Sequence, residues 1–214
     1  MTPVISFIFP TRRPDRLETA LASFYDTTAT YDVEALVVAD LPEVHEALDG
    51  LAHLCVTEPL TAPQAWNLGA AASKAQWFGL GADDMLFHTG WLEAVWPLLQ
   101  EPWGVIGLDD GADSFNRLGW ATHWLVSRKF CLTHMGGVMV PPVYAHGMVD
   151  VEVCQLAQRL NLFTYAAGAL VEHLHPDWNK AERDALYERD LRDDKRLFSI
   201  RAYRGFPVTW EPQL

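Results

Sequence analysis

The sequence predicts an α/β fold, with a mainly parallel central sheet flanked by helices and a helical appendage at the C-terminus. Apolar runs rich in β-branched residues alternate with amphipathic segments through the first half of the chain. Most of these runs lack the polar–apolar alternation of a half-exposed strand, so we expect strands that are buried on both faces. Such alternation of strand and helix predicts parallel strands with helices covering the sheet.

The first half of the chain supplies five predicted strands and the helices between them. Residues 3–9 form a continuous apolar run that Pro10 ends, and Pro14 stands at the start of the following helix. Later segments repeat this pattern of a short apolar run followed by apolar residues at helical spacing. We expect strands at residues 3–9, 33–40, 54–56, 76–81 and 103–108, and helices at residues 13–26, 42–51, 61–75 and 90–100.

The alternation weakens after about residue 110. We expect a strand, a short helix and a Gly-Gly turn within residues 119–142, a helix at 149–162, a strand at 163–176 and a charged helix after it. Half of the basic residues lie between Lys180 and Arg204 and are interleaved with acidic ones, which is typical of a solvated helix with i,i+4 pairs. Residues 1–178 are therefore interpreted as one domain, and residues 179–214 as a helical tail packed on it.

Composition and charge argue against several classes of protein. The 16 basic and 28 acidic residues give a net charge of −12, which is unfavourable for general nucleic-acid binding because phosphate contacts supply most of that affinity. No apolar run approaches the roughly 20 residues that span a bilayer, and the N-terminus lacks a signal-peptide pattern. Three well-separated cysteines indicate reduced thiols. We expect a cytoplasmic protein (host cytoplasm if viral), not membrane-bound, as a monomer or weak dimer.

Polar residues follow three of the predicted strands at the point where each strand ends. Arg12, Asp40 and Asp83 each lie just past a carboxyl end, the edge of an open α/β sheet where ligands bind. The motifs GxxxxGK[ST], GxGxxG, HExxH and GxSxG do not occur in the sequence. Their absence disfavours P-loop, dinucleotide-binding, zincin and serine-hydrolase sites. We therefore expect these three loops to converge on a site of another class.

Three short motifs could carry chemistry, and each has a structural alternative. The acidic pair at residues 83–84 fits either a β-turn or a Mg²⁺ or Mn²⁺ site. Asp150, two residues before Glu152 at the start of a predicted helix, fits either complementarity to the helix dipole or a general base. His173 and His175 would share one face of a strand, either as structural residues or with one of them as a metal ligand.

Four segments match the patterns of one enzyme family in the same order and at similar spacing. The family's first strand and loop (PTxxRPxxLxxALxS) is matched by FIFPTRRPDRLETALASF, and its second strand by ALVVAD. A third pattern (GxxxARNxGxxxAxGxxxxxxDxDD) is matched by TAPQAWNLGAAASKAQWFGLGADD, and a fourth (EDxELxLRxxxxGxxxxxxPxAxxxH) by VDVEVCQLAQRLNLFTYAAGALVEHLHP. Residues 3–178 thus resemble the family 2 glycosyltransferases, which implies the GT-A fold.

The resemblance implies a role for each matched residue. Asp83 would be the last carboxylate of the metal-binding DxD motif, and His173 would join it in holding Mn²⁺ or Mg²⁺. Asp150 would be the catalytic base of a metal-dependent, inverting transfer from a nucleotide-diphosphate sugar to an acceptor hydroxyl. The donor would be bound by Pro10, Thr11, Arg12, Asp40, Asn67 and Ala82, with Asp40 at the nucleobase.

The sequence departs from the family pattern at three points. Gly81 stands where the first DxD carboxylate is expected, and Val149 replaces the first acid of the later acidic pair. One residue of the first loop is missing, so either Arg12 or Arg13 could take the position of the family's arginine. The alternative to an active enzyme is therefore a catalytically inactive GT-A module that binds a nucleotide or glycan.

The acceptor is left open among a hydroxymethylated DNA base, a saccharide and a protein. The charged tail is similar to that of small family members carried by bacteriophages, which implies DNA modification as one role. Trp120 and Trp124 lie in the segment expected to face the acceptor, where they could stack on a sugar or base or belong to the core. A nucleotidyltransferase is a weaker rival, because no Gly-rich phosphate loop follows the first strand.

Overall fold

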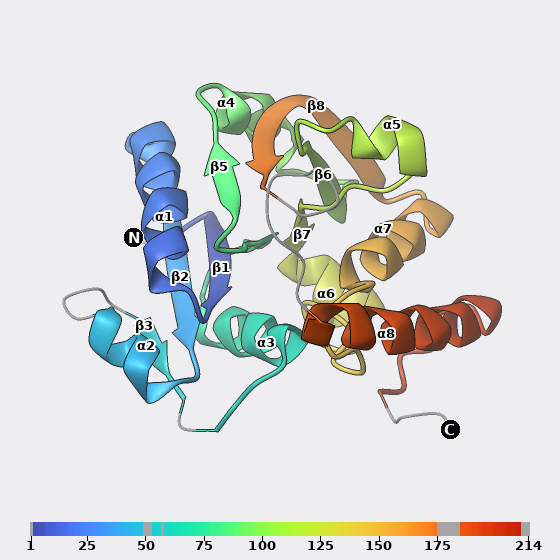
Figure 1. Ribbon diagram of the computed structural model, residues 1–214. Helices are drawn as coiled ribbons and strands as arrows, with labels where there is room; N and C mark the ends of the chain where they lie inside the picture. Colours follow the sequence, from blue (N-terminus) through green and yellow to red (C-terminus); the bar gives the residue numbers. More distant parts are fainter. Residues whose placement is uncertain (1, 49–52, 57, 175–184, 211–214) are drawn as a thin grey trace.

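The computed structural model describes residues 2–48, 53–56, 58–174 and 185–210 (Figure 1). Its strands are β1 (Ile5–Thr11), β2 (Val33–Ala39), β3 (His53–Cys55), β4 (Trp77–Leu80), β5 (Met85–Phe87), β6 (Val105–Asp109), β7 (Trp124–Ser127) and β8 (Phe163–His173). Its helices are α1 (Pro14–Thr28), α2 (Pro42–Ala47), α3 (Ala62–Ala72), α4 (Trp91–Val95), α5 (Ser114–Leu118), α6 (Arg128–His134), α7 (Val149–Arg159) and α8 (Ala185–Tyr203), with a 3-10 helix at Trp96–Leu98. Among these described helices, none combines the length and apolar character needed to cross a bilayer.

The strands form one sheet in the order β3-β2-β1-β4-β7-β6-β8-β5. The pairs β1–β2, β1–β4, β2–β3 and β6–β8 are parallel, whereas β7 runs antiparallel to β4 and β6, and β5 antiparallel to β8. The predicted mainly parallel α/β sheet is confirmed. From β1 the chain adds β2 and β3 on one side and β4 on the other, so the switch point lies between β1 and β4. Ligands of open α/β sheets bind outside such a point.

Strand β1 shows why its sequence is apolar at consecutive positions. Phe7 and Phe9 belong to a core formed with α1 and α4, whereas Ile8 points to the opposite face and packs in a core with α3, α6 and α7. Successive side chains of a strand alternate between its two faces, and here helices cover both (Figure 1). Strand β1 is therefore held by packing on both faces, and it positions the loop that follows Thr11.

Most predicted elements are present, with differences at their ends. The helix expected at 90–100 is split, because Pro97 lacks a backbone N–H and its ring disfavours a continuous α-helix, so α4 ends at Val95 and a 3-10 turn follows. Helix α3 begins at Ala62, where Thr61 and Gln64 form a capping box. Strand β5 and helix α5 were not predicted, since each has five residues or fewer.

Helix α8 is tied to the loop that precedes α7. Asp194 accepts hydrogen bonds of 2.7–2.9 Å from the backbone N–H groups of residues 145–147. Arg201 donates two hydrogen bonds to Glu152 in α7, with Nε 2.9 Å from Oε2, and both side chains are buried. The charged helix is thus packed on the rest of the chain. The expected domain boundary at residues 178–179 lies outside the described residues and stays a prediction.

Candidate active site

The loops after β1 and β2 are joined by an ion pair at the edge of the sheet. Arg12 Nε donates to Asp40 Oδ1 at 3.1 Å, and the backbone N–H of Leu60 donates to Asp40 Oδ2 at 2.7 Å. Burial raises the pKa of Asp40, but the hydrogen bonds from Arg12 and Leu60 outweigh it, so the net shift is downward. The end of β2 therefore carries an ionised carboxylate beside a cation.

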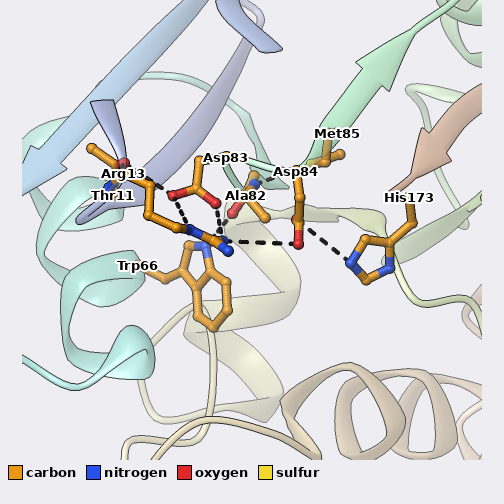
Figure 2. Close-up of polar contacts among 9 residues, drawn as sticks. Thr11, Arg13, Trp66, Ala82, Asp83, Asp84, Met85 and His173 are labelled. Atoms are coloured by element: carbon orange, nitrogen blue, oxygen red, sulfur yellow. Dashed lines mark hydrogen bonds and ion pairs between the residues drawn. The ribbon is translucent and has the colours of Figure 1, made fainter. Parts of the chain in front are cut away.

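Asp83 is held by the loop that follows β1. Thr11 Oγ1 donates to Asp83 Oδ2 at 3.1 Å, and Arg13 donates to both carboxylate oxygens, with its Nε 3.1 Å from Oδ2 (Figure 2). Burial raises the pKa of Asp83, and the hydrogen bonds and charge of Arg13 oppose that rise. The two adjacent arginines thus have different carboxylate partners, with Arg12 on Asp40 and Arg13 on Asp83.

Asp84 lies beside His173 at the same edge. Asp84 Oδ1 is 3.6 Å from His173 Nε2, and Asp84 Oδ2 is 3.9 Å from Arg13 Nη2 (Figure 2). Strand pairing sets this arrangement, because Met85 of β5 faces His173 of β8 and the Leu174 N–H donates to the Asp84 carbonyl at 2.8 Å. Burial alone would raise the pKa of Asp84, but its contact with His173 and the positive charges around it lower that pKa far below its usual value. Sequence analysis paired His173 with Asp83, whereas the carboxylate in contact with it is that of Asp84.

A second imidazole lies behind His173. The rings of His123 and His173 meet edge to face, with centroids 4.4 Å apart. His123 Nδ1 is 3.1 Å from the Leu80 carbonyl, which can only accept, so Nδ1 carries the proton. Burial lowers the pKa of His123 to about 3, so the ring is neutral near pH 7. Its buried Nε2 has no hydrogen-bond partner in the described part of the chain and presents a lone pair.

Asp84 and His173 offer one carboxylate and one imidazole at a spacing that suits two neighbouring ligands of a divalent cation. Neighbouring ligand atoms in a six-coordinate Mg²⁺ site lie about 3 Å apart, because each is about 2.1 Å from the metal. The 3.6 Å between Asp84 and His173 is close to that spacing. A mixed carboxylate and imidazole set also suits Mn²⁺.

A cavity of about 270 Å³ opens beside the acidic pair. It is lined by Arg16, Thr19, Asp83, Asp84, Met85 and Leu174. A larger cavity of about 480 Å³ lies at the opposite ends of the strands, where β4 and β6 begin. Its lining includes Gln76 and Leu162. We place the site at the smaller cavity, because it contains the carboxylates at the carboxyl ends of the strands.

Asp150 stands in the first turn of α7 and is close enough to His173 for their charges to interact. Burial of its carboxyl raises the pKa of Asp150 to about 6, and two backbone N–H groups and the charge of His173 oppose that rise. At neutral pH the group is mostly ionised, but it accepts a proton far more readily than an ordinary aspartate. The structure thus places Asp84 beside His173, and His173 within range of the charge of Asp150.

Three other residues expected at the donor occupy the framework around these groups. Asn67 makes three hydrogen bonds of 2.8–3.0 Å with the backbone of residues 139–140, which ties α3 to the loop that leads to α7. Pro10 lies within β1, and Ala82 lies in the turn between β4 and β5. Thr11 also contacts Asp83, as described above. The donor contacts of these residues stay predictions.

Gly81 lacks a side chain for a reason of packing. A Cβ atom at this position would lie 2.4 Å from the carbonyl oxygen of Ile8 and 3.1 Å from the ring of Phe9. The backbone is fixed there, since the Gly81 N–H donates to Ile8 O at 3.0 Å and Trp66 Nε1 donates to Gly81 O at 2.8 Å. The first carboxylate of the DxD pattern therefore cannot be accommodated without separating β4 from β1.

Restoring a side chain at this position is expected to destabilise the fold. Gly81→Ala should cost about 1–3 kcal/mol, as overpacking of a fixed backbone does, and lower Tm by about 2–12 °C. Gly168→Ala is the matched control, because its Cβ would lie 3.4 Å from Ala94 in ordinary contact. Thermal unfolding of both variants measures the difference. A Gly81→Ala protein as stable as wild type would contradict the packing argument.

Sequence analysis did not assign roles to Arg13, Asp84 or His123. The first two had a signal, because Arg13 was the open alternative to Arg12 and Asp84 adjoins the assigned carboxylate. His123 belongs to no motif. It reaches the site because β7 lies antiparallel between β4 and β6. The local sequence around His123 does not predict that placement.

No protein-family model and no curated protein matches this sequence. Among solved structures, the chain is similar to the mannosyltransferase PcManGT from Pyrobaculum calidifontis, in complex with GDP-Man and Mn²⁺. The TM-score is 0.62 and the sequence identity 14%, over 97% of this chain and 73% of the mannosyltransferase chain. At this identity the likeness shows the fold. The expected GT-A type of α/β fold is confirmed by it.

Proposed function

We propose that the protein is a metal-dependent inverting glycosyltransferase that moves a sugar from a nucleotide-diphosphate donor to an acceptor hydroxyl. The observation that carries this proposal is the contact of Asp84, just after β4, with His173, together with an Asp150 near enough to His173 for their charges to interact. The fold supports the same class, because the similar mannosyltransferase contains GDP-Man and Mn²⁺ in its structure.

Asp84 and His173 would hold Mn²⁺ or Mg²⁺, with Asp83 as a further ligand. When bound, the cation would neutralise charge that develops on the departing diphosphate. Arg13 binds Asp83 through both carboxylate oxygens, and a guanidinium can bind phosphate oxygens in the same bidentate manner. We infer that Arg13 exchanges Asp83 for the donor diphosphate, which frees Asp83 to face the metal position.

The nucleotide is proposed to lie along the carboxyl ends of β1 and β2. Asp40 would accept a hydrogen bond from the base through Oδ1, because Arg12 Nε uses one of the two lone pairs of that oxygen, whereas Arg12 Nη2 and the Leu60 N–H use both lone pairs of Oδ2. The full set proposed for the donor remains Pro10, Thr11, Arg12, Asp40, Asn67 and Ala82.

Asp150 is proposed to act as the general base. As the acceptor oxygen forms its bond to the anomeric carbon, the acceptor proton passes to the Asp150 carboxylate. The bond between the anomeric carbon and the phosphate oxygen breaks, and its electron pair leaves on the nucleoside diphosphate. Attack from the face opposite the leaving group inverts the anomeric configuration.

The acceptor classes considered are a hydroxymethylated DNA base, a saccharide and a protein. Trp124 is fully buried in the core, so it does not serve as a stacking surface for any of them. Trp120 is only partly buried against that core and keeps the role of candidate platform.

The second candidate function is a GT-A module that binds a nucleotide or glycan without turnover. Two observations favour it, because Gly81 cannot carry the first DxD carboxylate and Val149 is buried where the family pattern has an acid. The two functions differ in one property. A module that binds a nucleotide would share donor binding with the enzyme, but only the enzyme requires Asp150 to accept a proton.

Donor binding is tested by a thermal-shift screen of nucleotide sugars with and without Mn²⁺. A ligand at about 100 times its Kd stabilises the folded state by about 2.7 kcal/mol, which corresponds to a rise in Tm of about 5–10 °C. Asp84→Asn should lose the Mn²⁺-dependent part of the shift, whereas Asp193→Asn, an exposed acid of α8, should retain it. If no nucleotide sugar stabilises the wild-type protein in the presence of Mn²⁺, the proposed donor site is wrong.

A further inference from the structure

Two histidines and a cysteine meet at the edge of the sheet, away from the acidic pair. His45 lies on α2, and His53 and Cys55 lie on β3, the edge strand next to α2 (Figure 1). His53 and Cys55 are two residues apart on one strand, so their side chains point to the same face. Within the described ranges, this is the one group of three His, Cys, Asp or Glu side chains whose ligand atoms all lie within 4.8 Å of one another.

The distances in this group suit a tetrahedral metal site. His53 Nε2 lies 3.2 Å from His45 Nδ1 and 3.2 Å from Cys55 Sγ. In a tetrahedral zinc site, bond lengths of about 2.0–2.1 Å to nitrogen and 2.3 Å to sulfur place two nitrogens about 3.3 Å apart, and a nitrogen and a sulfur about 3.6 Å apart. Two of the three pairs are thus already near the spacing that one ion would require, and the ligand atoms of all three residues lie within 4.8 Å of one another.

Hydrogen bonding at the far side of His45 prepares its ring to be a ligand. His45 Nε2 lies 3.2 Å from the backbone carbonyl of Val56. A carbonyl only accepts, so Nε2 carries a proton, and Nδ1 is the ring nitrogen that faces His53 and could bind a metal. A histidine that binds a metal through one nitrogen commonly donates its other N–H in this way.

We propose that His45, His53 and Cys55 form a binding site for Zn²⁺, separate from the Mn²⁺ or Mg²⁺ site. On binding, the Cys55 thiol releases its proton to solvent and binds as thiolate, while the two neutral imidazoles bind through Nδ1 of His45 and Nε2 of His53. Cys55 is exposed, which leaves a fourth position open to water. Thiolate and imidazole select Zn²⁺, whereas carboxylate oxygens select Mg²⁺ and Mn²⁺.

The ion would join two elements that flank the proposed nucleobase position. In the parallel register of β2 and β3, Val37 faces His53 and Ala39 faces Cys55, and Asp40 follows directly after β2. A metal bound by residues of both α2 and β3 would therefore hold these two elements together beside Asp40. The site does not depend on glycosyl transfer, and its test reads metal binding alone.

The test is titration of the purified, metal-free protein with Co²⁺ as a spectroscopic substitute for Zn²⁺. One equivalent should produce a thiolate-to-metal charge-transfer absorption and the visible bands of a tetrahedral ion, and excess Zn²⁺ should abolish both. Cys55→Ser should remove the charge-transfer absorption, and His53→Ala should weaken Zn²⁺ binding at least about tenfold. His134→Ala, on α6, is the matched control and should bind as wild type does.

A second readout follows the thiol itself. Cys131 and Cys154 are buried, so iodoacetamide should alkylate Cys55 first in the folded protein, and Zn²⁺ should protect it. His53→Ala should lose that protection, whereas Asp84→Asn should keep it. The proposal fails if wild type shows no thiolate absorption with Co²⁺, if that absorption persists in Cys55→Ser, or if Zn²⁺ leaves the alkylation rate unchanged.

Discussion

Asp150→Asn is expected to lower kcat by about 10²–10⁴-fold while donor binding is retained. The amide has nearly the shape of the carboxylate but cannot accept the proton of the acceptor hydroxyl. Stability should not fall, because burial already disfavours the ionised form and raises the pKa of Asp150 to about 6. Steady-state kinetics and donor-dependent thermal shifts of the same preparation separate turnover from binding.

The pH profile supplies a second readout of the same residue. Because the base must be deprotonated, the wild-type rate should fall as pH drops through about 6. Metal at Asp84 and His173 should move this inflection to lower pH, since nearby positive charge favours the carboxylate. Asp193→Asn, at an exposed position, is the control and should keep the wild-type rate. Unchanged turnover in Asp150→Asn would show that Asp150 is not the base.

Arg201→Met is expected to cause the largest loss of stability of any single change considered. Arg201 pairs with Glu152 through two hydrogen bonds, and Tyr144 donates to Glu152 Oε2 at 2.6 Å, all in a buried setting. Removal of the guanidinium leaves the buried carboxylate of Glu152 without its charged partner, which costs about 3–5 kcal/mol of folding free energy. Thermal unfolding should show a decrease in Tm of about 6–20 °C.

The control for this change lies on the same stretch of chain. Arg204 is exposed, so Arg204→Met should alter stability by less than about 0.5 kcal/mol. Arg201→Met should also lower kcat, because Glu152 lies in the same first turn of α7 as Asp150. An Arg201→Met protein with wild-type Tm would show that α8 does not stabilise this helix.

Much of the fold could be predicted because its strands are buried on both faces. The uninterrupted apolar run of β1, with Phe7 and Ile8 facing opposite cores, is a local signal that needs no tertiary information. Strand β5 and helix α5 had no such signal. Each is too short for its periodicity to show and is held by its partner, as Met85 is by pairing with His173.

The site could be predicted in outline and not in its contacts. The convergence of the loops after β1, β2 and β4 follows from parallel topology, and the structure joins Arg12 to Asp40 and Arg13 to Asp83. Which carboxylate contacts His173 depends on the register of β5 against β8, and that register places Asp84 there. His175, which the sequence analysis gave as a possible metal ligand, lies outside the described residues.

The most direct test of the central claim is nucleoside diphosphate release from a stabilising donor, measured with candidate acceptors in the presence of Mn²⁺ and then of a chelator. The account predicts release with Mn²⁺, loss to background in chelator and recovery when Mn²⁺ is restored. Full release in chelator would contradict the metal-dependent mechanism. No release from any donor that binds in the presence of Mn²⁺ would contradict catalysis and leave the chain a binding module.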